Sequence, residues 1–397
     1  VFCNSIGTSW HETSWNAAWD TWWHYKEGVI GGPSHWGQTA YMTYADDVWP
    51  ACHKGRLQSP ISISSSNLTY DPSLQPLVIV GKDKQIDLEI SNAGQDLRID
   101  LLDASPQILL TGGPLSYEYR VFGALIKFGS KSQHGSDHQV DGVPFPAEVG
   151  RIVQCTLNQE AFNYLTIFFE TFHTCIQKIC TPLCIGCVSY FSMKRESFFR
   201  NTFMRRSAVR IYVHYCLHVL QMQLYAYNYL LYANVSMAVP RPHGLAAIAV
   251  FLKVGEHPSA DLSALLATAE EVQLRGQSRR LNGLLISALL PSTKQYMTYE
   301  GSIPFPACHE TVTWIVLNQA MIITETQLKA LRELRIAPFA NSGRMSDNFR
   351  PTQSLNNRSV RTNIQFAEQP QFSSEIQDSN SLLNHPNKRT VFHLCFL

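Results

Sequence analysis

The stretch Tyr299–Leu317 reads YEGSIPFPACHETVTWIVL, and its last seven residues, Thr311–Leu317, form a short apolar run with the composition of a β-strand. Similar runs recur along the chain and are separated by Gly, Asn and Pro, which mark turns. These predicted strands are Leu77–Val80, Ile86–Ile90, Leu97–Leu101, Ile108–Leu110 and Gly244–Val254. One helix is predicted, at Glu325–Leu334, where leucines share a face. Many short strands with few helices indicate a mainly β domain with short helices.

The composition excludes several classes of protein. The chain has 397 residues, of which 45% are hydrophobic, enough for one large domain or two ordinary ones. Its formal net charge of +1 argues against a nucleic-acid partner, because such proteins carry a strong positive excess. No uncharged apolar run of about 18 residues occurs, so we expect no membrane span.

Residues 161–230 differ from the rest of the chain. They contain no Asp, one Gly and one Pro, and they are rich in Phe, Tyr, Cys and basic residues. The cysteines invite a zinc site, but only Cys184 and Cys187 form the Cys-x-x-Cys pair that zinc knuckles use. We therefore interpret this segment as an atypical insertion outside the functional fold, either a translated intron or a binding insert of one lineage.

Eight blocks of sequence, taken in order, resemble one known family. They are QSPISI (Gln58–Ile63), YDPSLQPL (Tyr70–Leu77), SNAGQ (Ser91–Gln95), GGPLSYEYR (Gly112–Arg120), FGSKSQHGSDHQVDG (Phe128–Gly142), FPAEV (Phe145–Val149), Tyr299–Leu317 and NFRPTQSLNNR (Asn348–Arg358). Their order and spacing are similar to those of the α-carbonic anhydrases over about 22–160 and 231–368. The resemblance implies a domain at 22–368, interrupted by 161–230, with an N-terminal extension (1–21) and a disordered tail (369–397).

The fold that this resemblance implies is a large, twisted, mostly antiparallel central sheet with a conical pocket. In active members a zinc ion lies at the pocket floor, held by a His-x-His pair on one strand and a third His on the neighbouring strand. Neutral imidazoles leave the metal its charge, and the open fourth position lowers the pKa of a bound water to about 7.

The predicted ligand positions of this chain hold no histidine. In RVFGALIKFGS (Arg120–Ser130) the His-x-His pair is replaced by Leu125 and Lys127, and the third position falls on Gly150. We therefore expect no zinc and no other cofactor. We consider two hypotheses for Lys127. In the first, its ammonium fills the vacated metal position and pairs with Asp137 or another acid. In the second, its side chain extends to the pocket mouth.

Three further pocket positions differ from the family pattern, two of them in chemical type and one by a conservative replacement. The proton-shuttle histidine corresponds to Gln95, which cannot titrate. The threonine that orients the zinc-bound hydroxide corresponds to Pro304, which has neither a hydroxyl nor a backbone N–H. The acidic partner of that threonine corresponds to Asp137. His138 matches a family histidine with a structural role.

Two stretches resemble one subgroup in particular. WWHYKEG (Trp22–Gly28) and MSDNFRPTQSLNNRSVRTNIQF (Met345–Phe366) are similar to the secreted carbonic anhydrase-related proteins of the X and XI type. That subgroup lacks catalytic activity and associates with neurexin-type adhesion receptors. The resemblance implies a secreted, non-catalytic binding or scaffold protein. The alternative is a zinc-dependent carbonic anhydrase with unconventional ligands.

The remaining predictions concern two cysteines and three asparagines. Extracellular members of the family join the regions of Cys52 and Cys308, so the resemblance implies a disulfide between them. Three Asn-x-Ser/Thr sequons, at Asn67, Asn234 and Asn357, are candidate glycosylation sites of a secreted protein.

Overall fold

The computed structural model describes residues 23–37, 49–131, 134–144 and 219–365. All of them belong to one compact unit of the chain. The predicted N-terminal extension (1–21), the predicted tail (369–397), Gly150 and residues 161–218 of the predicted insertion lie outside the described residues.

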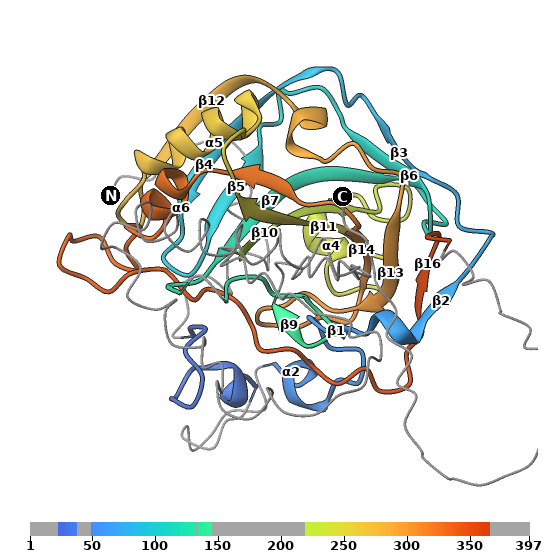
Figure 1. The fold of residues 1–397 in the computed structure, drawn as a ribbon. Coiled ribbons are helices and arrows are strands. Elements are labelled where there is room, and N and C mark those ends of the chain that lie inside the picture. The colour runs from blue at the N-terminus through green and yellow to red at the C-terminus, as the bar shows by residue number, and fades with distance from the viewer. Residues whose placement is uncertain (1–22, 38–48, 132–133, 145–218, 366–397) are drawn as a thin grey trace, which may run out of the picture. The chain divides into compact units, whose positions relative to one another are not determined.

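A large, mostly antiparallel sheet forms the body of this unit (Figure 1). Along its main path the strands are β12 (Ser278–Leu285), β4 (Gln85–Asn92), β5 (Leu97–Leu101), β7 (Tyr119–Phe128), β10 (Val219–Tyr227), β11 (Leu245–Val254), β14 (Val312–Leu317), β13 (Tyr296–Gly301), β16 (Val360–Thr362) and β2 (Leu68–Tyr70). Beside this path, β15 (Met321–Ile323) pairs with β11, and β3 (Leu77–Val80) pairs with β6 (Leu109–Gly112), which also pairs with β7. A small second sheet contains β1 (Ser62–Ile63), β8 (Gln139–Val140) and β9 (Val143–Pro144). The predicted mainly β fold class is confirmed.

The helices are short. They are α2 (Ala51–Lys54), α4 (Val235–Ala238), α5 (Ala260–Glu270) and α6 (Glu325–Leu331), with 3-10 turns η1 (Pro33–His35), η2 (Ser65–Asn67) and η3 (Ile286–Leu289). The predicted helix at Glu325–Leu334 is α6, which begins at a capping box formed by Thr324 and Gln327 and ends three residues earlier than predicted. Helices α5 and α6 pack on one face of the sheet, where their leucines join its apolar core.

Strand β10 corrects the predicted insertion. Its residues Val219–Tyr227 lie inside 161–230, yet β10 pairs with both β7 and β11 in the centre of the sheet. The prediction was therefore wrong for 219–230, and Glu160 does not continue directly into Leu231. The period-two pattern of a strand is present in LQMQLYAY, where apolar Leu220, Met222 and Leu224 alternate with two glutamines and a tyrosine. The unusual composition of the preceding residues concealed it.

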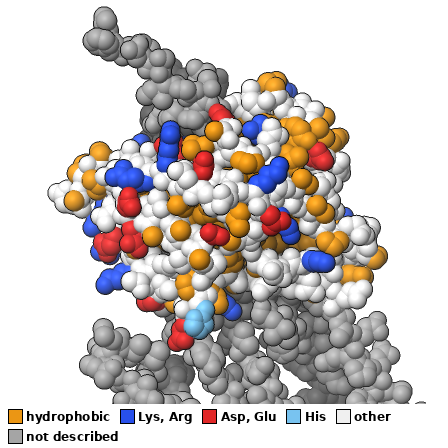
Figure 2. All heavy atoms as spheres, turned by 90° about the horizontal axis from the view of Figure 1, so that it is seen from above, with side chains coloured by type: hydrophobic (Ala, Val, Ile, Leu, Met, Phe, Trp, Pro, Cys, Tyr) orange, Lys and Arg blue, Asp and Glu red, His pale blue; other side chains and the backbone are white. Residues whose placement is uncertain are grey.

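The surface carries both signs of charge. On the face seen in Figure 2, acidic and basic side chains are intermixed among hydrophobic ones. This distribution matches the formal net charge of +1 and differs from the single-sign patch of a nucleic-acid-binding face.

Candidate active site

The positions predicted for zinc ligands lie on two neighbouring central strands. Leu125 and Lys127 lie on β7, two residues apart and therefore on the same face of the sheet. In the antiparallel register, Gln223 of β10 faces Leu125, and Gln221 faces Lys127. The strand that follows β7 in the chain and pairs with it is thus β10, so Gln223 holds the third position. Gly150, the residue predicted for this position, lies outside the described residues.

Lys127 is buried completely and its ammonium is held in place. Its Nζ donates to Asp96 Oδ1 at 2.7 Å and to the Tyr25 hydroxyl at 2.7 Å. The same nitrogen lies 4.5 Å from the centre of the Tyr25 ring, within the range of a cation–π interaction. The side chain does not extend to a pocket mouth. Of the two hypotheses for Lys127, the structure agrees with the one that places its ammonium inside the pocket. Its acid partner is Asp96, not the Asp137 named from the sequence.

Asp96 accepts from three donors contributed by distant parts of the chain. Besides Lys127, the Tyr25 hydroxyl donates to Oδ2 at 2.8 Å and the Asn348 amide donates to Oδ1 at 3.0 Å. Burial raises the pKa of Asp96 to about 6, although the Lys127 charge and these hydrogen bonds act in the opposite direction. Burial is also the main reason that the pKa of Tyr25 lies well above its usual value. The three side chains form one buried unit, which we call the lysine cluster (Tyr25, Asp96 and Lys127).

Asp137 belongs to a second, adjoining network. Gln223 Nε2 donates to its Oδ2 at 2.6 Å, and the backbone N–H of Arg350 donates to its Oδ1 at 2.7 Å. Burial raises the pKa of Asp137, while the charge of Lys127 is the largest effect that lowers it. Asp137 is therefore a structural acceptor for β10 and for the C-terminal segment.

His138 lies next to Asp137 and continues this network. Its Nδ1 lies 3.1 Å from Gln221 Nε2, and its Nε2 lies 2.8 Å from the Tyr299 hydroxyl, which donates to Ser59 Oγ. Gln223 Nε2 donates to Gln221 Oε1 at 3.1 Å, which leaves the Gln221 amide to donate to His138. Burial lowers the pKa of His138 to about 4, so the imidazole is neutral at physiological pH. These contacts are those of the structural role predicted for His138.

Gln95 and Pro304 offer little chemistry to this site. Gln95 is half-buried, and its Nε2 lies 3.5 Å from the Trp23 carbonyl, at the limit of a hydrogen bond. Pro304 is buried and has no donor. Neither residue supplies a titratable group or a hydroxyl.

Aromatic side chains occupy the space around the lysine cluster. Trp23 stacks on Phe305 with ring centres 6.5 Å apart and meets Tyr25 and Trp36 edge-on at 5.1 and 5.4 Å. All four rings are buried. A cavity of about 210 Å³ lies beside the end of β5 and the start of β7, and Lys127 does not line it. A second, smaller cavity is lined by Leu125 and Tyr225 among others, and Lys127 lines neither of the two. Lys127 is fully buried, so its side chain is not exposed at a pocket mouth.

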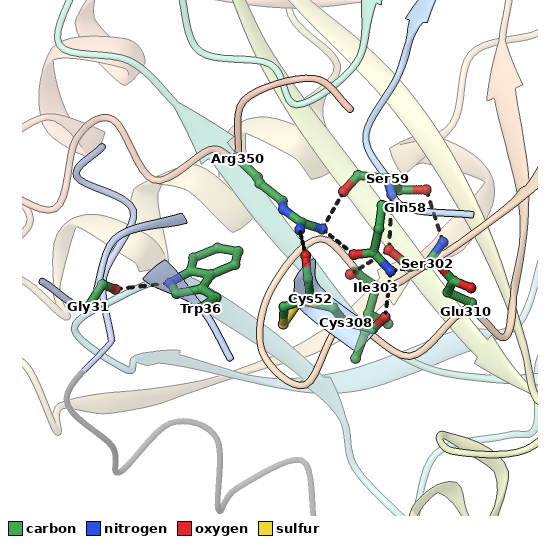
Figure 3. The surroundings of a disulfide bond; sticks show 10 residues. All are labelled: Gly31, Trp36, Cys52, Gln58, Ser59, Ser302, Ile303, Cys308, Glu310 and Arg350. Atoms are coloured by element: carbon green, nitrogen blue, oxygen red, sulfur yellow. Dashed lines mark hydrogen bonds between the residues drawn. A yellow bond between two sulfur atoms is a disulfide. The ribbon is translucent and has the colours of Figure 1, made fainter. Parts of the chain in front are cut away.

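The predicted disulfide is present. Cys52 and Cys308 are bonded, with Cα atoms 5.0 Å apart, and Arg350 lies beside them (Figure 3). The Arg350 guanidinium donates to the Cys52 carbonyl, to Gln58 Oε1 and to the Ser59 carbonyl at 3.2, 2.9 and 2.8 Å, and it lies 5.3 Å from the Trp36 ring. This region ties the N-terminal segment to the segment that precedes β14.

Comparison with known proteins identifies the family. The model of the eukaryotic-type carbonic anhydrases matches residues 31–164 and 213–364. The chain belongs to this family. A Caenorhabditis elegans protein named "Putative carbonic anhydrase-like protein 2" is 31% identical over 356 residues, which cover 88% of this chain and 82% of that protein. "Putative carbonic anhydrase-like protein 1" of the same organism is 26% identical over 407 residues, 86% of this chain and 90% of that protein. The match resumes at 213, ahead of β10, as the corrected boundary requires.

The donors at the three ligand positions do not fit the zinc site of a carbonic anhydrase. Leu125 has no donor atom, Lys127 uses its ammonium protons on Asp96 and Tyr25, and Gln223 donates to Asp137 while its Oε1 accepts from Tyr225 at 2.8 Å. Within the described ranges, no three His, Cys, Asp or Glu side chains gather into a group that could hold a metal ion. Zinc in proteins requires such nitrogen, sulfur or carboxylate ligands.

The predicted glycosylation sites lie on the surface of the carbonic anhydrase domain. Asn67, Asn234 and Asn357 are all exposed, as attachment of a glycan requires. Among the helices that the structure describes, none has the length and apolar character needed to cross a membrane.

Proposed function

We propose that this carbonic anhydrase-related chain binds no zinc in the family pocket and does not hydrate carbon dioxide. The observation that carries the proposal is the buried ion pair of Lys127 and Asp96 at 2.7 Å. A zinc ion next to this ammonium would face a like charge in a medium of low dielectric constant. Removing Lys127 from the site would leave Asp96 without its cation, so the ion pair also opposes displacement by the metal.

The other pocket positions support the same proposal. Carbon dioxide hydration needs a metal-bound hydroxide, a group that orients it and a proton relay. Pro304 cannot orient a hydroxide and Gln95 cannot relay protons. Asp137, at the position of the acidic partner, accepts from Gln223 and from the Arg350 backbone. The residues needed for three separate steps are therefore replaced or committed elsewhere.

A zinc measurement tests this proposal. Purified full-length chain is dialysed, its zinc content is measured by mass spectrometry, and carbon dioxide hydration is followed by a pH indicator. We expect no zinc in the pocket and a rate equal to the buffer blank. Because the cysteine-rich segment could bind zinc by itself, the variant Cys184→Ser/Cys187→Ser is measured in parallel. Zinc that persists in this variant together with chelator-sensitive hydration would overturn the proposal and favour an enzyme with unconventional ligands.

We further propose that the chain is secreted and acts as an extracellular binding or scaffold protein, with a neurexin-type adhesion receptor as its partner. The disulfide supports an oxidising compartment, because such bonds are rare in the cytosol. The exposed sequons support the same compartment. The partner rests on the resemblance to the X and XI type subgroup.

Two measurements test these points. The chain with a secretion signal is expressed in animal cells, and we expect soluble protein in the medium with the Cys52–Cys308 bond formed in a non-reduced peptide map. Immobilised neurexin ectodomain is then titrated with this protein. Saturable binding that an unrelated secreted carbonic anhydrase does not show is the expected result, and its absence would refute the proposed partner while leaving secretion intact.

A further inference from the structure

A cavity of about 210 Å³ opens near the ends of β5, β7 and β10, away from the lysine cluster. Its lining includes Asp103, Gln107, Arg120, Phe122, Tyr227 and Asn234. Pockets for drug-sized ligands measure roughly 300–1,000 Å³, so this cavity suits a smaller group. None of the zinc-ligand positions lines this cavity, and neither of the disulfide cysteines does.

Asn234 forms part of the cavity wall, and it is the acceptor of a sequon with Ser236. Its side chain is exposed, and its Oδ1 accepts from the backbone N–H of Met237 at 3.0 Å. This hydrogen bond fixes the amide plane and leaves Nδ2, the atom that carries an N-linked sugar, without a competing role. The other two sequon asparagines, Asn67 and Asn357, do not line the cavity.

The lining has the mixed chemistry that carbohydrates bind. Phe122 and Tyr227 contribute aromatic rings with centres 6.3 Å apart, which offer apolar surface to the C–H faces of a sugar. Asp103, Gln107 and Arg120 contribute an acceptor, an amide and a cation. Within the part of the chain that the structure describes, no hydrogen bond or ion pair engages these three side chains, so hydroxyl and acetamido groups can bind them.

We propose that the first sugar of an N-linked glycan on Asn234 lies in this cavity and packs against Phe122 and Tyr227. The proposal rests on the proposed secretion, since the glycan is added only along that route. Covalent attachment supplies a high effective concentration of the sugar, so weak contacts suffice to hold it there. The occupied cavity then closes the surface between α4 and the segment Leu101–Gln107.

The test compares three glycan-removing variants of the secreted protein. Ser236→Ala removes the glycan of Asn234 and keeps the Asn234–Met237 hydrogen bond, whereas Thr69→Ala and Ser359→Ala remove the glycans of Asn67 and Asn357. Site occupancy is read by glycopeptide mass spectrometry, and hydrogen exchange is followed in Leu101–Gln107. We expect Ser236→Ala alone to accelerate exchange there several-fold and to lower Tm.

A second variant separates a seated sugar from a general effect of glycosylation. Asp103→Ala/Gln107→Ala changes exposed side chains, so the fold should persist. In the glycosylated protein it should weaken the protection that the Asn234 glycan gives. Equal exchange in Ser236→Ala and in the two control variants would overturn the proposal. So would an Asn234 without glycan in protein that carries glycans at Asn67 or Asn357, a result that leaves the proposed secretion standing.

Discussion

The two faces of strands β7 and β10 are held together by different kinds of interaction. On one face every side chain is apolar and packs in a core that includes α5 and α6. On the other face, Lys127 pairs with Asp96, and Gln223 donates to Asp137 and to Gln221. The apolar side chains are Ala124, Ile126, Phe128, Leu220, Met222 and Leu224, and those of the opposite face are Leu125, Lys127, Gln221, Gln223 and Tyr225.

The two faces should therefore respond differently to substitution. Apolar packing is non-directional, and its loss scales with the volume removed. Buried charges and amides depend on named partners, and removal of one partner leaves the other unsatisfied in a medium of low dielectric constant. The polar face should therefore be the sensitive one, and its sensitivity should depend on pH.

The largest effect is expected from Lys127→Met. The substitution keeps an unbranched side chain but leaves the buried Asp96 without its cation, which should lower the free energy of unfolding by about 3–5 kcal/mol at pH 8. Without Lys127 the pKa of Asp96 rises above about 6, because the charge that opposes burial is gone. Denaturant unfolding at several pH values measures both effects.

The pH dependence of this variant has a definite sign. A carboxyl whose pKa is raised in the folded state binds more protons there than in the unfolded chain, so stability falls as pH rises from about 3.8 through the folded pKa. The loss caused by Lys127→Met should thus be smaller at pH 5 than at pH 8. The control Lys82→Met changes an exposed lysine and should shift stability by less than about 0.5 kcal/mol. A loss equal at both pH values would contradict the ion-pair account.

The next largest effect concerns His138. Burial lowers its pKa from 6.5 to about 4, so the folded state binds fewer protons than the unfolded chain between these values. Its contribution is complete above pH 6.5 and is lost as pH falls through about 4, with a total of about 3 kcal/mol at 1.36 kcal/mol per pKa unit. His138→Gln should remove this part of the acid sensitivity, as measured by urea unfolding between pH 4 and 7. His257→Gln, at an exposed histidine, is the matched control, and an unchanged slope in His138→Gln would refute the assignment.

A small, pH-independent effect is expected on the apolar face. Ile126→Val removes one methylene group from a fully buried side chain and should lower the free energy of unfolding by about 0.5–1.5 kcal/mol. The same denaturant experiment at pH 5 and pH 8 checks this value. A loss above about 3 kcal/mol, or one that varies with pH, would show that the two faces do not differ as described.

Strands were predicted correctly where the local sequence pattern was clear. Leu77–Val80 and Leu97–Leu101 were predicted with the bounds that β3 and β5 have, because turn residues delimit each run. Strand β10 was missed because unusual composition outweighed its alternation, and α5 was missed although Ser259 caps its first turn. Composition was thus a poorer guide than periodicity.

The site was less predictable because its contacts join distant parts of the chain. The spacing of Leu125 and Lys127 placed both on one face of a strand, as the structure has them. The partners of Lys127 could not be predicted in the same way, because Asp96 lies 31 residues from Lys127 in the sequence and Tyr25 lies 71 residues from Asp96. Gln223 could have been found from the alternation of β10, had that strand been recognised.

The smallest net change is expected when both charges of the ion pair are removed together. Lys127→Met/Asp96→Asn leaves no buried charge in the lysine cluster, and the new amide oxygen still accepts from Tyr25 or Asn348. Replacement of a buried ion pair by uncharged groups of similar volume is often close to neutral, so the double variant should lie within about 1 kcal/mol of the original chain. The losses of the single variants Lys127→Met and Asp96→Asn, added together, would then exceed the loss of the double variant by several kcal/mol, as expected for two residues in contact. The double variant should also lose the part of the pH dependence of Lys127→Met that comes from Asp96, because the lysine cluster no longer holds a carboxyl. If the double variant is as unstable as Lys127→Met at pH 8, the instability of the single variant comes from lost packing around the Lys127 stem, and the polar face is held by shape in the same way as the apolar one.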